Sequence, residues 1–168
     1  HNQAEQTWVN GGNAKFSGEH LIVEAAQQFA NGIEGSLLGY YGSFNTELNR
    51  KYLNGINIDS STAKPKAASV ALRARVEMKD VVKQGNVSVS PYAAYTYTKT
   101  KLEAYMENGG GFPAQYDAAT FKSNDLRLGA NFKTSINSAT DVKIGVELAH
   151  RFEKSTTGVN GKVIGLYD

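Results

Sequence analysis

Strict one-for-one alternation of apolar and polar residues is the feature that most limits how this chain can fold. From Ala68 to Met78 every even residue is apolar, and the same phase returns over residues 126–133 and 142–148. Successive side chains of a β-strand point to opposite faces, so each segment predicts a strand with one apolar and one polar face. The polar face carries too many full charges to pack as a dry core. The alternation therefore favours a barrel whose apolar outside meets lipid.

The composition excludes several classes of protein. A length of 168 residues predicts a single domain over residues 1–168. The net charge is only +2, which argues against nucleic acid as a partner. The absence of cysteine excludes a disulfide framework and a thiolate metal site. No stretch approaches the ~20 consecutive apolar residues of a membrane-spanning helix.

Eight strands are predicted from the alternation and from turn signals. Five Asn-Gly pairs occur along the chain, and this dipeptide is preferred in type I′ turns because both central positions need positive φ. Several predicted strands reach the ~9–11 residues that a tilted membrane strand needs. The predicted strands are 4–10, 19–30, 33–45, 67–80, 86–105, 122–136, 141–153 and 162–168.

The predicted connections alternate between short and long. Every second connection of an up-and-down meander lies at the same end, so all the long loops should share one end, as they do in outer-membrane barrels. The short turns are 31–32, 81–85 and 137–140, and the longer connections are 45–66, 106–121 and 154–161.

The segment 86–105 contains two irregular features. Its apolar phase changes from odd to even positions, which predicts a β-bulge near residues 99–101. Pro91 cannot donate a hydrogen bond to a neighbouring strand, so it predicts a bulge, a strand edge or a fraying end at that point.

The polar phase supplies the candidate functional residues. If the apolar face meets lipid, these side chains line the interior of the barrel, where they pair across the lumen or line a wet passage. A mixture of both signs argues against an ion-selective lumen. The candidate pore-lining residues are Arg73, Arg75, Glu77, Arg127, Lys143, Glu147 and Arg151.

Alternation alone does not distinguish the inside of a barrel from its outside. The alternative is a soluble antiparallel β-barrel that binds a small apolar ligand. In that protein the apolar side chains would point inward, namely Leu72, Val76, Leu128, Phe132, Ile144 and Leu148.

No pattern in the sequence predicts catalysis, a cofactor or a metal. The three histidines are not spaced as a chelating pair, and no Gly-x-Ser-x-Gly motif is present. The run 109–111 is three glycines without the Lys-Ser/Thr of a phosphate-binding loop, so it predicts a flexible loop tip. The small polar segment 60–66 predicts a mobile loop. We therefore expect no enzymatic activity.

Several motifs in the second half resemble the translocator β-domain of bacterial autotransporters. The resemblance lies in the run Ser90-Pro91-Tyr92-Ala93-Ala94-Tyr95-Thr96-Tyr97 and in the Tyr105-Met106-Glu107-Asn108-Gly109 loop that follows. It continues in Asp125-Leu126-Arg127-Leu128-Gly129-Ala130 and in the strand 142–152, with Glu147, His150 and Phe152. The opening Thr7-Trp8-Val9-Asn10-Gly11-Gly12 is a weaker similarity. The well-matched part is about 86–153.

This resemblance implies an all-β, antiparallel transmembrane barrel of twelve strands in the bacterial outer membrane. A helix would pass through the pore, and the domain would anchor and export a passenger segment of the same chain. The implied partners are the lipid bilayer, that passenger in cis and the barrel-assembly machinery. The sequence departs from the family in supplying about eight strands, no amphipathic helix before them and no terminal aromatic strand. We therefore expect a piece of such a domain or a shortened relative.

Overall fold

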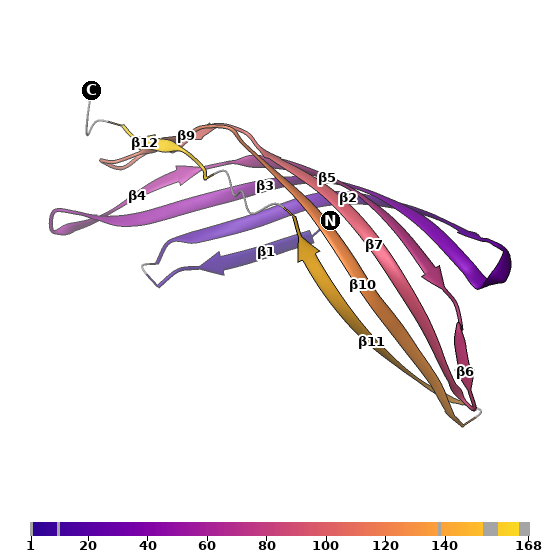
Figure 1. Cartoon of the computed structure of the whole chain (residues 1–168). Coiled ribbons are helices and arrows are strands. Elements are labelled where there is room, and N and C mark those ends of the chain that lie inside the picture. Colours follow the sequence, from indigo (N-terminus) through magenta and orange to yellow (C-terminus); the bar gives the residue numbers. More distant parts are fainter. Residues whose placement is uncertain (1, 10, 138, 153–157, 165–168) are drawn as a thin grey trace.

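The computed structural model describes residues 2–9, 11–137, 139–152 and 158–164, and it is a curved all-β structure (Figure 1). Seven antiparallel strands form a meander in the order β1-β2-β3-β5-β7-β10-β11. They are β1 (Asn2–Thr7), β2 (Asn13–Gln28), β3 (Ile33–Asn54), β5 (Lys66–Met78), β7 (Val87–Leu102), β10 (Ala119–Asn137) and β11 (Thr140–Arg151).

Five short strands complete the structure. The strand β4 (Asn57–Ala63) pairs with β3, and β6 (Val82–Gln84) pairs with β7. A second, three-stranded sheet has the order β12-β9-β8. Its members are β8 (Tyr105–Met106), β9 (Ala114–Tyr116) and β12 (Gly161–Val163). No helix in the described ranges is long and apolar enough to cross a membrane.

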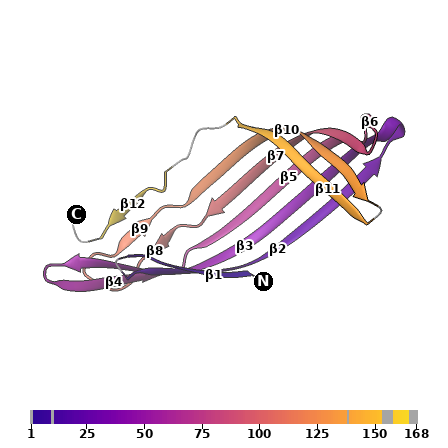
Figure 2. The same ribbon diagram turned by 90° about the horizontal axis from the view of Figure 1, so that it is seen from below.

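The two ends of the meander differ, as the alternation of loop lengths predicted (Figure 2). One end carries the β2–β3 turn, the β6 hairpin and the β10–β11 turn. In the β2–β3 turn Asn31 and Gly32 both have positive φ, 63° and 74°, as a type I′ turn requires. The opposite end carries the β3–β4 hairpin and the β8–β9 loop. The predicted separation of the connections between two ends is thus confirmed for 31–32, 81–85 and 106–121, whereas residues 138 and 154–157 of the other predicted connections lie outside the described residues.

At the long-loop end, more residues lie in β-strands than we predicted. Residues 45–66 are not a loop, because β3 continues to Asn54 and returns as β4. The predicted mobile segment 60–66 therefore lies largely in β4, where Ser61 is fully buried. The predicted eighth strand is present over Gly161–Val163 as β12, but it does not continue the meander, because it pairs with β9 in the second sheet rather than with β11. Residues 165–168 of that prediction lie outside the described residues.

The predicted bulge near residues 99–101 was wrong. The strand β7 pairs with both β5 and β10 through Leu102 without a register shift. Pro91 lies where the β5 ladder has ended at Tyr92 and the β6 ladder has not yet begun at Val89. Pro91 therefore faces a local strand edge on that side, where a missing N–H costs no ladder bond.

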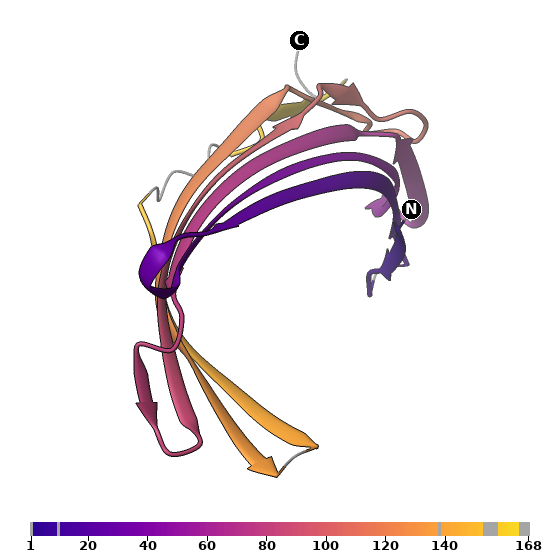
Figure 3. The ribbon, with the colours of Figure 1, turned by 90° about the vertical axis from the view of Figure 1, so that its right-hand side faces the viewer.

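The sheet is curled but open, so a closed eight-stranded ring is not what these residues form. In Figure 3 the strands follow one arc, with β1 and β11 on its two sides. Within the described ranges β1 and β11 do not pair with each other. Among the described residues the buried hydrophobic side chains are all alanines: Ala14, Ala63, Ala94, Ala114 and Ala119. The described residues therefore build a two-faced sheet without a conventional core of large apolar side chains.

Candidate functional site: a charged face across the curved sheet

One face of the meander collects the charged side chains of five strands, and we call it the charged face. The strand register sets its membership, because directly paired residues share a face. Arg73 lies opposite Thr96, which lies opposite Asp125, which lies opposite Arg151. A second row of directly paired residues, four residues further along β5, consists of Glu77, Tyr92, Gly129 and Glu147. All seven residues predicted as one polar phase lie on this face: Arg73, Arg75, Glu77, Arg127, Lys143, Glu147 and Arg151.

Ion pairs connect most of these seven residues. Arg75 donates to Glu77 at 2.7 Å along β5. Arg127 on β10 donates to Glu147 on β11 at 2.8 Å. Basic and acidic groups of the face thus neutralise each other locally.

Of the remaining three predicted residues, two have ion-pair partners outside the predicted set. Arg151 donates to Asp125 at 2.9 Å. Lys143 forms no ion pair among the described residues and lies opposite Lys133, which pairs with Asp141 at 3.0 Å. Arg73 donates to Glu24 at 3.2 Å. The charged face therefore extends from β11 to β2.

Three hydrogen bonds of the charged face skip a strand. Arg73 on β5 reaches Glu24 on β2 across β3. Asn131 on β10 donates to Glu77 on β5 across β7, at 3.2 Å. The Tyr92 hydroxyl on β7 donates to Glu147 on β11 across β10, at 2.7 Å. Strands two apart in a sheet are separated by about 9–10 Å, so such contacts need side chains that converge. Convergence is what the concave side of a curled sheet provides.

A glycine makes one of these contacts possible. Gly129 lies between Tyr92 and Glu147 in the register, and a Cβ built on it would lie 2.6 Å from the Tyr92 ring. The ring therefore lies over the bare backbone of Gly129, and its hydroxyl reaches the next strand. Arg75 stacks on the same ring, with Cζ 3.8 Å from its centre. The arrangement joins four strands through one aromatic side chain.

Sequence reasoning missed several members of this network. Glu24 on β2 and Glu34 on β3 also lie on the charged face. Glu24 pairs with Arg73, and Glu34 forms an ion pair with Lys79 at 2.5 Å. Their phase was hidden because apolar Ile22 and Ala26 share their parity. Tyr92 and Asn131 were missed because neither carries a formal charge.

The opposite face exposes large apolar side chains. Leu128 is 51% exposed, Leu148 is 77% exposed and Phe132 is 37% exposed. Val76, Leu72 and Ile144 share this face and are also exposed. The soluble alternative required these six side chains to fill a dry interior, and the structure does not place them in one. We call this surface the apolar face.

A second polar cluster joins the β3–β4 hairpin to the β8–β9 loop. Arg50 donates from Nε to Glu107 at 2.8 Å and from Nη2 to the Phe112 carbonyl at 2.7 Å. Glu107 is buried and also accepts the Ala114 amide at 3.0 Å. The hydrogen bonds to Glu107 raise the pKa of Arg50, so the guanidinium stays charged. We call this group of contacts the loop clamp.

The loop clamp corrects the prediction of a flexible glycine tip. Gly110 has a φ of +71°, and a Cβ there would lie 2.8 Å from the Ser60 carbonyl oxygen. Asp59 accepts the Gly111 amide at 2.7 Å, and the bonds from Gly111 and Ser60 lower the pKa of this carboxyl. Gly110 and Gly111 therefore allow the loop to approach the hairpin closely.

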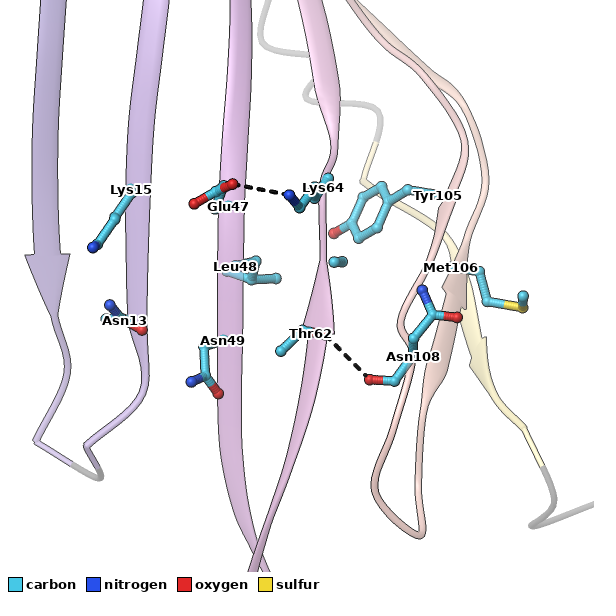
Figure 4. Close-up of a pocket in the computed structure, with 11 residues that line it drawn as sticks. Asn13, Lys15, Glu47, Leu48, Asn49, Thr62, Lys64, Tyr105, Met106 and Asn108 are labelled. Carbon is cyan, nitrogen blue, oxygen red and sulfur yellow. Dashed lines mark hydrogen bonds and ion pairs between the residues drawn. The ribbon is translucent and has the colours of Figure 1, made fainter.

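An open hollow of about 730 Å³ lies beside the same hairpin (Figure 4). Its walls mix polar and apolar groups: Lys64 pairs with Glu47 at 3.0 Å, the Thr62 hydroxyl donates to the Asn108 carbonyl, and Leu48 and Met106 also line it. Lys15 and Tyr105 also line it. The six apolar residues of the soluble alternative do not line this hollow, so it is not the apolar ligand site that the alternative requires.

Comparison with known proteins agrees with the fold. The chain matches the family described as autotransporter beta-domain over residues 2–168. Its structure is similar to the translocator domain of autotransporter NalP from Neisseria meningitidis, with a TM-score of 0.76 and 12% identity. That match covers 92% of this chain and 53% of the other, so this chain spans about half the length of that domain.

A second solved structure is more distant. BauA, the ferric preacinetobactin receptor from Acinetobacter baumannii, matches with a TM-score of 0.47 and 10% identity, over 91% of this chain and 27% of that one. The search of curated proteins gave no match. The similarity to NalP shows the fold, and the family match extends over nearly every residue. The chain therefore belongs to the autotransporter β-domain family.

Proposed function

We propose that this chain forms part of a translocator barrel that anchors and exports a passenger segment of its own polypeptide. Membership of the family places the chain in the outer membrane of a bacterium. In the proposed arrangement the apolar face meets lipid and the charged face lines the passage. The domain carries out no bond chemistry, and barrel-assembly machinery inserts it into the membrane.

The contacts that skip a strand are the observation that carries this proposal. Charged and polar side chains converge over β5, β7, β10 and β11, while leucine, valine and isoleucine on the other face stay exposed. A water-soluble sheet would cover its apolar face. A membrane barrel exposes that face to hydrocarbon and keeps polar groups in its lumen.

The proposed lumen lining consists of the seven charged residues and their partners on the same face. Their mutual ion pairs leave little net field along the wall, which suits the passage of an unfolded peptide of any charge. A lumen of one sign would retain peptides of the opposite sign.

The open edges of the sheet need further strands in this arrangement. The unpaired backbone groups of β11 and of β2 beyond β1 cannot be satisfied by lipid. A closed barrel therefore requires strands that pair with both edges.

Photo-crosslinking in secreting cells tests the proposal. A photoreactive amino acid replaces either Arg127 or Leu128, which are neighbours that point to opposite faces of β10. We expect the probe at position 127 to capture the passenger of the same polypeptide during export, and the probe at 128 to capture none.

Two results would contradict the proposal. Capture of the passenger from 128 but not from 127 would reverse the facing of the sheet. Passenger exposed on the cell surface with no capture from 127, or from the corresponding positions 75 and 147, would show that export does not pass this face.

A further inference from the structure

The apolar face carries few charged residues. On four of its strands they are all positively charged and all lie near the long-loop end of the sheet. On the apolar side of β5, β7, β10 and β11 the formally charged residues of the described chain are lysines only. No aspartate, glutamate or arginine shares that side of these strands. The lysines are Lys66 on β5, Lys99 and Lys101 on β7, and Lys122 on β10. All four are exposed and lie toward the long-loop end.

Two of these lysines lie directly opposite each other. Lys99 pairs in register with Lys122, and Lys101 follows two residues later on the same face. Like charges directly opposite on neighbouring strands destabilise a sheet. Among the described residues none of the three forms an ion pair, although nine ion pairs occur elsewhere. The three lysines thus occupy neighbouring register positions of one face without an ion pair, and Glu103, the acid that follows β7, pairs with none of them among the described residues.

The position of these lysines matches the edge of a bilayer. Apolar-face residues of β7 run from Val87 to Tyr97, about 35 Å of strand. A tilt of about 45° reduces that length to about 25 Å, the height of the apolar band of an outer-membrane barrel. Tyr95 and Tyr97 end the band, as aromatic residues do at a membrane interface. Lys99 and Lys101 follow them, at the depth of the lipid headgroups.

Two other lysines at this end, Lys64 and Lys15, have an acidic neighbour. Lys64 pairs with Glu47 at 3.0 Å, and Lys15 lies opposite the same Glu47. Both groups of lysines are at the same end of the sheet, yet Lys99, Lys101 and Lys122 have no acid directly opposite them in the strand register. The uncompensated charge is therefore local rather than general.

We propose that Lys99, Lys101 and Lys122 form a binding site for the phosphate groups of lipid headgroups. The proposal rests on the proposed function, because it requires the apolar face to meet the bilayer. Cβ atoms of directly opposed residues are about 5 Å apart, so the ammonium groups of Lys99 and Lys122 can both reach one phosphate. Lys101 adds a third donor on the same face. Long loops mark the external end of such barrels, so the site meets the outer leaflet.

Spin-label EPR of the intact protein in phosphatidylcholine bilayers tests this site. Spin-labelled phosphatidic acid and spin-labelled phosphatidylcholine are added separately, and the fraction of each lipid immobilised by the protein gives their relative association constants. We expect phosphatidic acid to be preferred. The double variant K99Q/K122Q should reduce that preference by about fivefold or more, since one lysine near an anionic surface contributes about that factor. The matched control K15Q/K64Q removes the same charge at the same end and should retain the preference.

The outcomes separate this proposal from the one on which it rests. Immobilised phosphatidylcholine with no preference for phosphatidic acid would refute the lysine site and leave the lipid-facing assignment intact. Equal losses in K99Q/K122Q and K15Q/K64Q would also refute the site, because general electrostatic attraction would then explain the preference. A protein that immobilises no lipid of either kind would overturn the lipid-facing assignment and the site with it.

Discussion

The charged face and the loop clamp both rely on arginine–carboxylate pairs, but they place them in different surroundings. Arg73 and Glu24 on the charged face have side chains that are 36% and 45% exposed. In the loop clamp the Glu107 side chain is 1% exposed, and Arg50 contacts it through two nitrogens. Water screens the first pair and is excluded from the carboxylate of the second. We therefore expect the pair on the charged face to tolerate substitution, whereas the pair in the loop clamp holds the β3–β4 hairpin against the β8–β9 loop.

Removal of the buried carboxylate should have the largest effect. Glu107→Ala leaves Arg50 without its partner and leaves the Ala114 amide without its acceptor. Breaking a buried pair costs about 3–5 kcal/mol, and the partial exposure of Arg50 places the expected loss near the lower figure. Hydrogen exchange of the 107–114 backbone in the folded barrel should accelerate accordingly.

A conservative variant serves as the control for this prediction. Glu107→Gln keeps one carbonyl acceptor for Arg50 or the Ala114 amide, so its loop should exchange at a rate between those of the wild type and Glu107→Ala. Unchanged exchange in Glu107→Ala would show that the loop is held without the pair.

A charge placed on the apolar face should have the next largest effect. Leu128 lies near the middle of β10 and is 51% exposed on that face. Leu128→Arg should destabilise the barrel in lipid by about 2–4 kcal/mol, because an arginine at mid-bilayer must leave water. Urea unfolding of the protein in lipid vesicles measures the loss.

The adjacent position supplies the matched comparison. Arg127→Ala removes a charge from the opposite face and should cost much less than Leu128→Arg. Equal tolerance of the two changes would contradict the facing of the sheet that both proposals use.

The difference between the two regions also explains what sequence reasoning could reach. Alternation predicted the charged face from Arg73, Arg75 and Glu77. In a membrane barrel every strand that crosses the bilayer must alternate apolar and polar residues with a period of two. Where a strand extends beyond the bilayer, both of its faces meet water, and the alternation of apolar and polar residues is no longer required. Leu102 continues β7 on the charged face without a bulge, although its apolar character suggested a phase change.

The loop clamp could not be predicted from local sequence for a related reason. Arg50 and Glu107 are 57 residues apart and meet only after the hairpin and the loop have folded. Glu107 does fall within the Tyr105–Gly109 segment that carries the family resemblance. Its buried role depends on the fold around it, because the same glutamate in an exposed loop would make no such pair.

An exposed pair on the charged face should contribute little. Arg73→Ala removes the ion pair with Glu24 that spans β3. Exposed pairs contribute about 0.2–1 kcal/mol, so the urea midpoint should shift only slightly. A loss as large as that of Leu128→Arg would mean that the charged face is desolvated and that the contrast with the loop clamp is wrong.

The smallest expected effect concerns pH at the edge of the loop clamp. Bonds from the Gly111 and Ser60 amides lower the pKa of Asp59 below its ordinary value of about 3.9. A lowered folded-state pKa means that the contribution is complete above the unfolded value and is lost as pH falls through the folded one. The loop should therefore stay docked from pH 7 to pH 5 and loosen only below about pH 4. The NMR shift of the Gly111 amide should follow this titration, and it should stop doing so in Asp59→Asn, which cannot ionise. A Gly111 shift that moves between pH 7 and pH 5 would show that another group controls the loop.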